Sequence, residues 1–257
     1  MEDVGTFILA HEPAVRLAAF AGIIAAMAGW EVLAPRRPRS TGRSKRWPVN
    51  LGIAALNTVI LRVVFPTAAV GMAVLAETRG WGVLNSVALP GWASGLIAIV
   101  VLDLSLYAQH VVFHKVPLLW RLHRLHHADV DVDLTTGARF HPLEIVLSMV
   151  FKMGLVVALG APAAAVVIFE VLLNANAIFN HANVRMPERV DRILRLVLVT
   201  PDMHRVHHSV LREETDSNYG FQLACWDRVF GTYREQPALG HQAMELGVWK
   251  TKTVSDR

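Results

Sequence analysis

The sequence predicts an all-α integral membrane protein, a bundle of about four to five membrane helices with a histidine-rich cap on its cytoplasmic side. Hydrophobic residues make up 53% of the 257 residues, charged residues only 18%, and the mean hydropathy is +0.38. A soluble domain carries about 25% charged residues. The polar residues that remain are gathered in a few stretches, and histidine is prominent among them.

The first apolar run covers residues 14–34 and is long enough to cross a bilayer. No basic region precedes it, so we expect a retained helix and not a cleavable signal peptide. A basic loop follows over residues 35–48, with Arg36, Arg37, Arg39, Arg43, Lys45 and Arg46. Positive charge in short loops marks the cytoplasmic side of a membrane. The N-terminus is therefore expected outside.

The later apolar runs predict the remaining membrane helices, at residues 49–76, 92–114, 143–159 and 163–179. Two further helices are expected at the membrane surface, a short one at 81–89 and an amphipathic one at 188–199. With this path, every histidine discussed below lies at the cytoplasmic ends of the helices.

Two histidine-rich stretches stand out within this pattern. Residues 110–127 read HVVFHKVPLLWRLHRLHH, and residues 201–208 read PDMHRVHH. Helix positions i, i+3 and i+4 share one face, so each HxxHH triplet directs its imidazoles to one point. Neutral imidazole binds iron, zinc, copper and nickel. Eight such residues are more than one metal ion needs, which predicts two metals: His110, His114, His123, His126, His127, His204, His207 and His208.

Charged residues inside the apolar runs are also informative. Asp103 lies about two turns before His110, and Arg62 lies within the second run at a similar depth. An unpaired charge in a membrane is costly, so we expect these two side chains to form a structural ion pair.

Ligand type alone does not choose among iron, copper and zinc. The histidines are expected at helix ends that open into lipid, where an unactivated C–H bond offers no carbonyl for a Lewis acid, and this favours oxygen activation. A zinc-dependent membrane hydrolase is the alternative, but HVVFH has valine where the HExxH motif has its glutamate. A transporter would need ligands near the midplane, and a structural metal site would be closed and tetrahedral.

The motifs HVVFH, WRLHRLHH and DMHRVHH, together with TTGARFHPLE and SNYGFQLACWDRVFGTY, resemble the histidine boxes of the fatty acid hydroxylase/sterol desaturase superfamily. This resemblance implies a membrane di-iron enzyme that uses O₂ to hydroxylate or desaturate a fatty acyl, sterol-like or isoprenoid lipid. It implies that the eight box histidines are ligands, with His181 as a ninth. His141 remains open between ligand and supporting residue.

The ring N–H groups of metal-binding histidines usually meet a carboxylate or carbonyl. Asp129, Asp131, Glu144, Asp202 and Asn180 are candidates by their positions. For Asp202, capping of the helix that carries the third box is equally compatible.

The resemblance divides the chain into N-terminal membrane helices (1–90), a hydroxylase-type catalytic domain (91–235) and a tail expected to be disordered (236–257). We expect electrons from a separate ferredoxin or cytochrome b5-like donor, and location in a bacterial inner membrane or its equivalent. Cys225 is the single cysteine, which excludes an internal disulfide and a cysteine-based metal site. Basic residues lie beside apolar segments, which favours a membrane surface over nucleic acid as partner.

Overall fold

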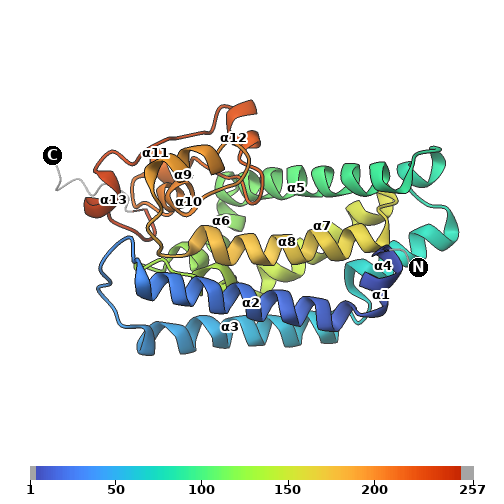
Figure 1. Ribbon diagram of the computed structural model, residues 1–257, viewed down its shortest axis with the longest axis horizontal. Coiled ribbons are helices and arrows are strands. Elements are labelled where there is room, and N and C mark those ends of the chain that lie inside the picture. Colours follow the sequence, from blue (N-terminus) through green and yellow to red (C-terminus); the bar gives the residue numbers. More distant parts are fainter. Residues whose placement is uncertain (1–3, 250–257) are drawn as a thin grey trace.

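The computed structural model describes residues 4–249. Long helices lie side by side along the long axis of the molecule, and short helices cover one end of them (Figure 1). The described residues contain no β-strand, only isolated β-bridges. The long helices are α2 (Glu12–Leu33), α3 (Arg43–Val64), α5 (Gly91–Lys115), α7 (Pro142–Leu159) and α8 (Ala163–His181), with α1 (Val4–Ala10) and α4 (Ala68–Arg79) at the far end.

Five helical segments are long and apolar enough to cross a membrane, which confirms the predicted membrane bundle. The second segment differs from the prediction, because it begins at Arg43 and breaks after Val64 instead of running unbroken to residue 76. Pro66 explains the break, since proline lacks a backbone N–H and disfavours helical geometry in the residue before it. The chain resumes as α4, whose fully buried Ala69, Ala73 and Ala76 pack closely against α7 and α8.

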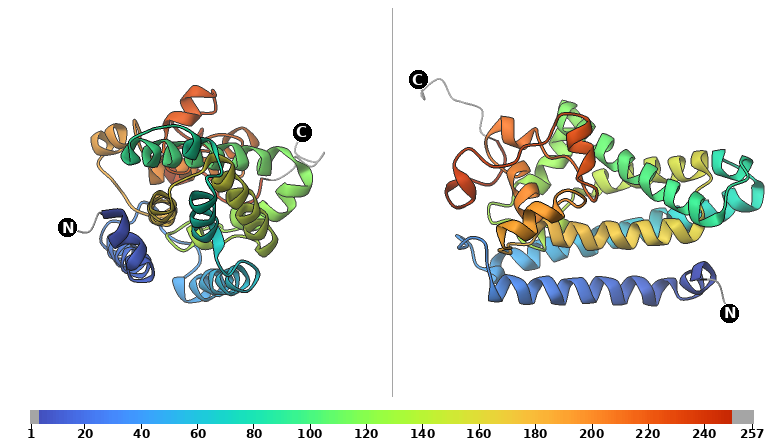
Figure 2. Two further views of the ribbon diagram at one scale, coloured as in Figure 1. Left: turned by 90° about the vertical axis from the view of Figure 1, so that its right-hand side faces the viewer. Right: turned by 45° about the horizontal axis from the view of Figure 1, so that its top comes forward.

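Helix α8 is the most buried of the five segments. It lies between α2 on one side and α5 on the other (Figure 2). The small residues Ala163 and Ala165 and the buried Phe169 join the largest apolar cluster of the interior. The polar residue Glu170 within this helix is satisfied by Arg16 at 2.7 Å and by Lys152. This burial fixes the position of the helix end that carries His181.

The predicted ion pair between Asp103 and Arg62 is wrong. Asp103 is 1% exposed, and its carboxylate accepts hydrogen bonds from the Trp226 indole at 2.8 Å and from Leu223 N at 3.2 Å. Arg62 is exposed on the outer face of α3. A segment 120 residues downstream therefore supplies the partners of Asp103, which the sequence pattern within the spans does not reveal.

The cap, residues 116–141 and 182–249, covers the end of the bundle opposite the N-terminus (Figure 1). Its helices are α6 (Pro117–His127), α9 (Glu188–Leu194), α10 (Pro201–His207), α11 (Arg212–Thr215), α12 (Cys225–Val229) and α13 (Gly240–Ala243), with the 3-10 turn η2 (Thr136–Ala138). The second 3-10 turn, η1 (Val83–Ser86), lies at the far end within the predicted surface helix at 81–89. Helix α9 is shorter than the predicted 188–199, because the chain turns at 195–197 before entering α10.

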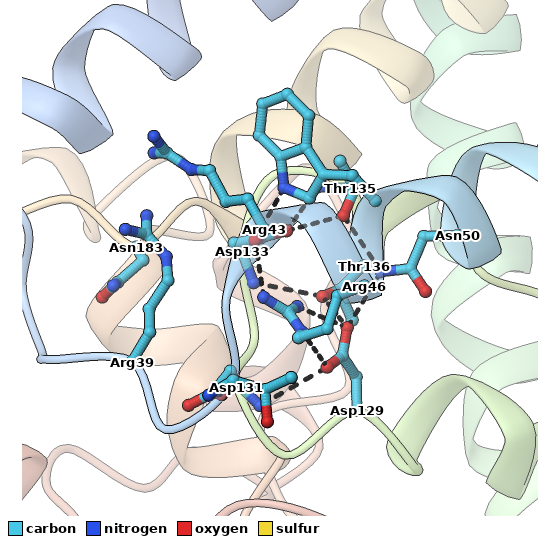
Figure 3. A network of polar contacts seen from close by, with 12 residues as sticks. Arg39, Arg43, Arg46, Asn50, Asp129, Asp131, Asp133, Thr135, Thr136 and Asn183 are labelled. Atoms are coloured by element: carbon cyan, nitrogen blue, oxygen red, sulfur yellow. Dashed lines mark hydrogen bonds and ion pairs between the residues drawn. The ribbon is translucent and has the colours of Figure 1, made fainter.

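The first turns of α3, which follow the basic loop, are bound to the cap by buried polar contacts (Figure 3). Arg46 donates to both oxygens of Asp129, at 2.8 and 2.6 Å, and to Asp133 at 2.7 Å. Asn50 adds a hydrogen bond to Asp129 at 3.0 Å. The predicted role of Asp129 beside the histidines is therefore wrong, since its carboxylate serves this arginine. The contacts attach the N-terminal helices to the cap.

The predicted disorder of the tail is wrong for residues 236–249, whereas residues 250–257 lie outside the described part of the chain. Met244 and Leu246 are buried against Val132. The Met244 carbonyl accepts a hydrogen bond from Arg37, and Gly247 N donates to the carbonyl of His208. These residues of the tail thus pack against the rest of the cap beside the predicted ligand His208.

Candidate metal centre

The histidines are brought together by the ends of two membrane helices and by two helices of the cap. His110 and His114 lie in the last turns of α5, and Pro117 then starts α6 in a new direction. The HxxHH spacing of α6 places His123, His126 and His127 toward the bundle. Helix α10 supplies the second triplet and α8 supplies His181.

All nine histidines predicted as ligands meet in two adjacent groups, in each of which the ring nitrogens lie within 4.8 Å of one another. The first histidine group is His110, His114, His123, His127 and His207. The second histidine group is His126, His181, His204 and His208. Neighbours in the sequence are divided between the groups, as His126 and His127 are, and this division could not be read from the spacing.

Several ring nitrogens lie at the separation expected for ligands of a shared metal ion. The Nε2 atoms of His110 and His123 are 3.1 Å apart, and Nε2 of His181 is 3.0 Å from Nε2 of both His126 and His204. Two nitrogens bound at about 2.1 Å and at a right angle lie about 3 Å apart. The packing of the rings alone thus preforms positions for metal.

Carbonyl and carboxylate oxygens orient these rings from outside. The Nδ1–H groups of His110, His181 and His207 donate to the carbonyls of Tyr219, Ala177 and Ser217, at 2.8, 2.7 and 2.7 Å. His123 Nδ1 donates to the carboxylate of Glu144 at 2.7 Å. With Nδ1 protonated and bonded, Nε2 is the free ligand atom that points into the group. The expected contact of Glu144 with a predicted ligand is therefore present.

Burial keeps the cap imidazoles neutral, which is the state that binds metal. It lowers the pKa of His126, His127, His204 and His208 well below the usual value, and the neighbouring histidines lower it further. Burial also lowers the pKa of His207 to about 3, although the Ser217 carbonyl opposes this shift.

A second observation supports metal binding by these histidines. Among the nine histidines, the following buried ring nitrogens have no hydrogen-bond partner in the described part of the chain: His114 Nε2, His207 Nε2, His204 Nδ1, and both nitrogens of His127 and His208. A buried polar atom without a partner costs about 1–3 kcal/mol. Each imidazole binds a metal ion through one nitrogen, so coordination would satisfy one of these atoms in each of His114, His127, His207 and His208. The residues present therefore fit two metal ions bound by nitrogen.

Glu144 provides a direct test of this arrangement. We expect Glu144→Ala to weaken metal binding about 10–100-fold, because His123 loses the acceptor that orients its ring. Glu144→Gln keeps an acceptor oxygen and should retain most of the affinity. Titration of the purified protein against a competing chelator measures both. Equal losses in the two variants would contradict an orienting role.

The other candidates lie outside both groups, so the structure does not bring them to the metal positions. His141 accepts a hydrogen bond from Leu143 N at the start of α7. Asp202 forms ion pairs with Arg36 and Arg205. The N-cap residue of α10 is Thr200 and not Asp202. Asn180 donates to the Phe221 carbonyl, and Asp131 accepts from Ser40 and Thr41.

The structure also adds residues that the sequence reasoning did not single out. Phe140 stacks on His126 with a ring separation of 4.5 Å, and Phe221 lies within 6.1 and 6.4 Å of His110 and His204. Phe221 therefore borders both histidine groups. At Gly137 a Cβ atom would lie 2.4 Å from the Ala177 carbonyl and 3.2 Å from His181 Nδ1. Only glycine permits η2 to approach His181 this closely.

A bundle of apolar helices with two buried all-histidine groups at one end defines an integral membrane protein with sites able to hold metal. The family model for fatty acid hydroxylase matches residues 95–232, which is more than half of the chain. The chain belongs to the fatty acid hydroxylase family.

Curated relatives align with the same part of the chain. The ornithine lipid hydroxylase OlsE of Rhizobium tropici is 30% identical over 55% of this chain and 42% of its own length. Human alkylglycerol monooxygenase is 32% identical over 56% of this chain and 31% of its own length. Rat cholesterol 25-hydroxylase is 26% identical over 55% of this chain and 47% of its own length. The chain thus spans less than half the length of these relatives. No solved structure matches it.

Proposed function

We propose that the chain is a membrane oxygenase that holds two iron ions and uses O₂ to hydroxylate a lipid, with desaturation as the closely related outcome. The observation that carries this proposal is the pair of buried histidine groups at one end of an apolar helical bundle. The relatives are named for hydroxylation or monooxygenation of an ornithine lipid, an alkylglycerol and cholesterol. These names support a lipid substrate without choosing its class.

The donor set favours iron over zinc. A structural zinc site is tetrahedral and closed, whereas the first histidine group offers five ligands. When bound, a pair of iron ions would supply the oxygen-activating chemistry that an unactivated C–H bond requires. The residues of the chain hold the ligand rings, fix their protonation and exclude water, since the six cap histidines of the two groups are at most 2% exposed.

The proposed reaction also requires a source of electrons and protons. Hydroxylation places one oxygen atom of O₂ in a C–H bond and reduces the other to water, which consumes an electron pair and a pair of protons. The described residues include no cysteine cluster that could hold an iron–sulfur centre. We propose that a separate electron donor supplies this electron pair.

The basic loop supports a cytoplasmic position for the cap. Residues 35–48 lie at the cap end of the bundle, and the connections at the far end carry little positive charge (Figure 1). By the bias of Lys and Arg toward cytoplasmic loops, the cap faces the cytoplasm and the N-terminus lies outside.

Metal analysis and Mössbauer spectroscopy of protein from iron-enriched cells test the proposal, with His126→Ala as the comparison. About two irons per chain with a coupled signature, lost in the variant, would support an oxygenase. Stoichiometric zinc without iron, together with oxygen-independent cleavage of a lipid ester, would overturn it in favour of the zinc-dependent hydrolase.

A further inference from the structure

A second polar feature lies beside the cap, separate from the histidine groups. Helix α9, the segment leading into it and the start of α10 border a pocket of about 760 Å³. Its lining includes five arginines: Arg36, Arg185, Arg189, Arg192 and Arg195. The proposed oxygenase reaction uses none of them.

The charges of the pocket are only partly paired within the protein. Arg195 pairs with Asp191, while Arg36 and Arg205 share Asp202. In the described part of the chain, the side chains of Arg185, Arg189 and Arg192 have no ion-pair partner and are exposed toward the pocket. Two carboxylates of the lining, Glu188 and Glu235, likewise have no ion-pair partner there. Positive charge therefore exceeds negative charge around the cavity.

His241 adds a buried polar group to the same wall. Its side chain is 4% exposed, and neither ring nitrogen has a hydrogen-bond partner among the described residues. Nε2 lies 3.6 Å from Asp202, beyond hydrogen-bonding distance. The pocket thus offers a buried ring nitrogen as well as guanidinium groups to an incoming ligand.

The opposite face of α9 and the turn after it are apolar and exposed. Val190, Ile193, Leu196 and Val197 are 43%, 66%, 64% and 59% exposed. An amphipathic segment of this kind, with arginine on one face and aliphatic side chains on the other, is typical of a helix at the membrane surface.

The depth of this segment is fixed by its pairing with the bundle. Leu198 forms a β-bridge with Leu223, and Leu223 N donates to Asp103. Asp103 lies twelve residues before the end of α5 at Lys115, which corresponds to about 18 Å along the helix. The apolar turn at 196–197 is therefore near the level of the apolar part of α5, and the arginines of α9 are near the membrane surface.

We propose that the pocket beside α9 binds the head-group phosphate of an anionic bilayer phospholipid, which anchors the cap to the membrane surface. Guanidinium groups recognise phosphate through paired, charge-assisted hydrogen bonds. The adjacent aliphatic side chains contact the acyl region of the same lipid. This site is independent of the metal centre and of the oxygenase proposal.

Binding of fluorescent phosphatidylglycerol to the full chain in neutral detergent micelles tests the site without requiring metal or turnover. We expect saturable binding that phosphatidylcholine with the same chains displaces poorly. The double variant Arg189→Gln/Arg192→Gln should lower the affinity by about 10-fold or more. The double variant Arg62→Gln/Arg79→Gln removes the same two charges from exposed positions at the far end of the bundle and should leave binding unchanged. Arg189→Lys/Arg192→Lys keeps the charge and should restore part of the affinity.

Three results would overturn the proposal. Equal affinity for phosphatidylcholine and phosphatidylglycerol would mean that anionic lipid is not recognised. Equal losses in the α9 variant and in Arg62→Gln/Arg79→Gln would mean that only the overall charge matters. Displacement by inorganic phosphate at the concentration at which phosphatidylglycerol itself binds would indicate a site for free phosphate. Arg189 and Arg192 are exposed, so we expect each variant to fold. An unchanged elution volume from a sizing column checks this.

Discussion

Replacing His207 with alanine is expected to weaken metal binding in the first histidine group while the second keeps its metal, and replacing His208 should do the reverse. The two residues are neighbours at the end of α10, but their rings serve different groups, with ring planes at 85° to each other. Each variant should fall from about two metals per chain to about one. Hydroxylation should fall more than about 100-fold in both, because loss of a ligand exceeds the effect of losing a supporting residue.

Metal analysis of the purified variants, together with spectroscopy of the iron that remains, measures this outcome. His141→Ala is the matched control, since this histidine only accepts a hydrogen bond at the start of α7 and belongs to neither group. It should keep full metal content. Retention of both metals in His207→Ala and His208→Ala, or loss of metal in His141→Ala, would contradict the assignment of the nine histidines.

The eight box histidines were predictable because their spacing is local, whereas His181 followed only from the family resemblance. Box spacing within one helix fixes which imidazoles share a face, and the adjoining apolar runs fix the end of the bundle at which they lie. What joins them is not local: the partner of His110 is a carbonyl 109 residues away, and His181 meets His126 across 55 residues. The division into two groups depends on such contacts and could be seen only in the structure.

The incorrect predictions share the same cause. Asp103 and Arg62 looked like a pair because both lie within apolar sequence, yet the partners of Asp103 come from the segment at 223–226. Asp129 follows the second box directly but turns away to Arg46. The tail has a polar composition, and its described residues are held by long-range contacts with Arg37, Val132 and His208. Composition predicts membrane helices well and long-range polar pairing poorly.

The contacts of Arg46 matter to the site as well as to the fold. Asn50, one turn further along α3, bonds both Asp129 and Arg139, at 3.0 and 2.9 Å. The Arg139 carbonyl in turn accepts a hydrogen bond from His126 Nδ1 at 3.3 Å. A continuous set of polar contacts therefore joins the N-terminal helix α3 to the second histidine group. The N-terminal helices, which lie outside the region of family similarity, contribute in this way to positioning a ligand.

Arg46→Met is expected to lower the free energy of unfolding by about 3–5 kcal/mol, because Asp129 and Asp133 stay buried without a cation. For a chain of this size that corresponds to a fall in melting temperature of roughly 10 °C. Arg121→Met is the matched control, since Arg121 is exposed on α6 and should change the stability by less than about 0.5 kcal/mol. Thermal unfolding in detergent, followed by tryptophan fluorescence, measures both.

The pH dependence separates the loss of this ion pair from a general loss of packing. Burial alone would raise the pKa of Asp129, but Arg46 outweighs burial and holds it below the usual value. In the unmodified protein this stabilisation is present above the unfolded pKa of about 3.9 and is lost as the pH falls through the lower folded pKa. In Arg46→Met only the hydrogen bonds from Asn50 and Thr136 still oppose burial, so the folded pKa of Asp129 rises and protonation at mildly acidic pH relieves the uncompensated charge. The difference in melting temperature should therefore be largest at about pH 7 and smaller at about pH 4.5. Adding Asp129→Asn to Arg46→Met should recover part of the stability at pH 7, whereas a difference that is independent of pH and of Asp129→Asn would assign the effect of Arg46 to packing.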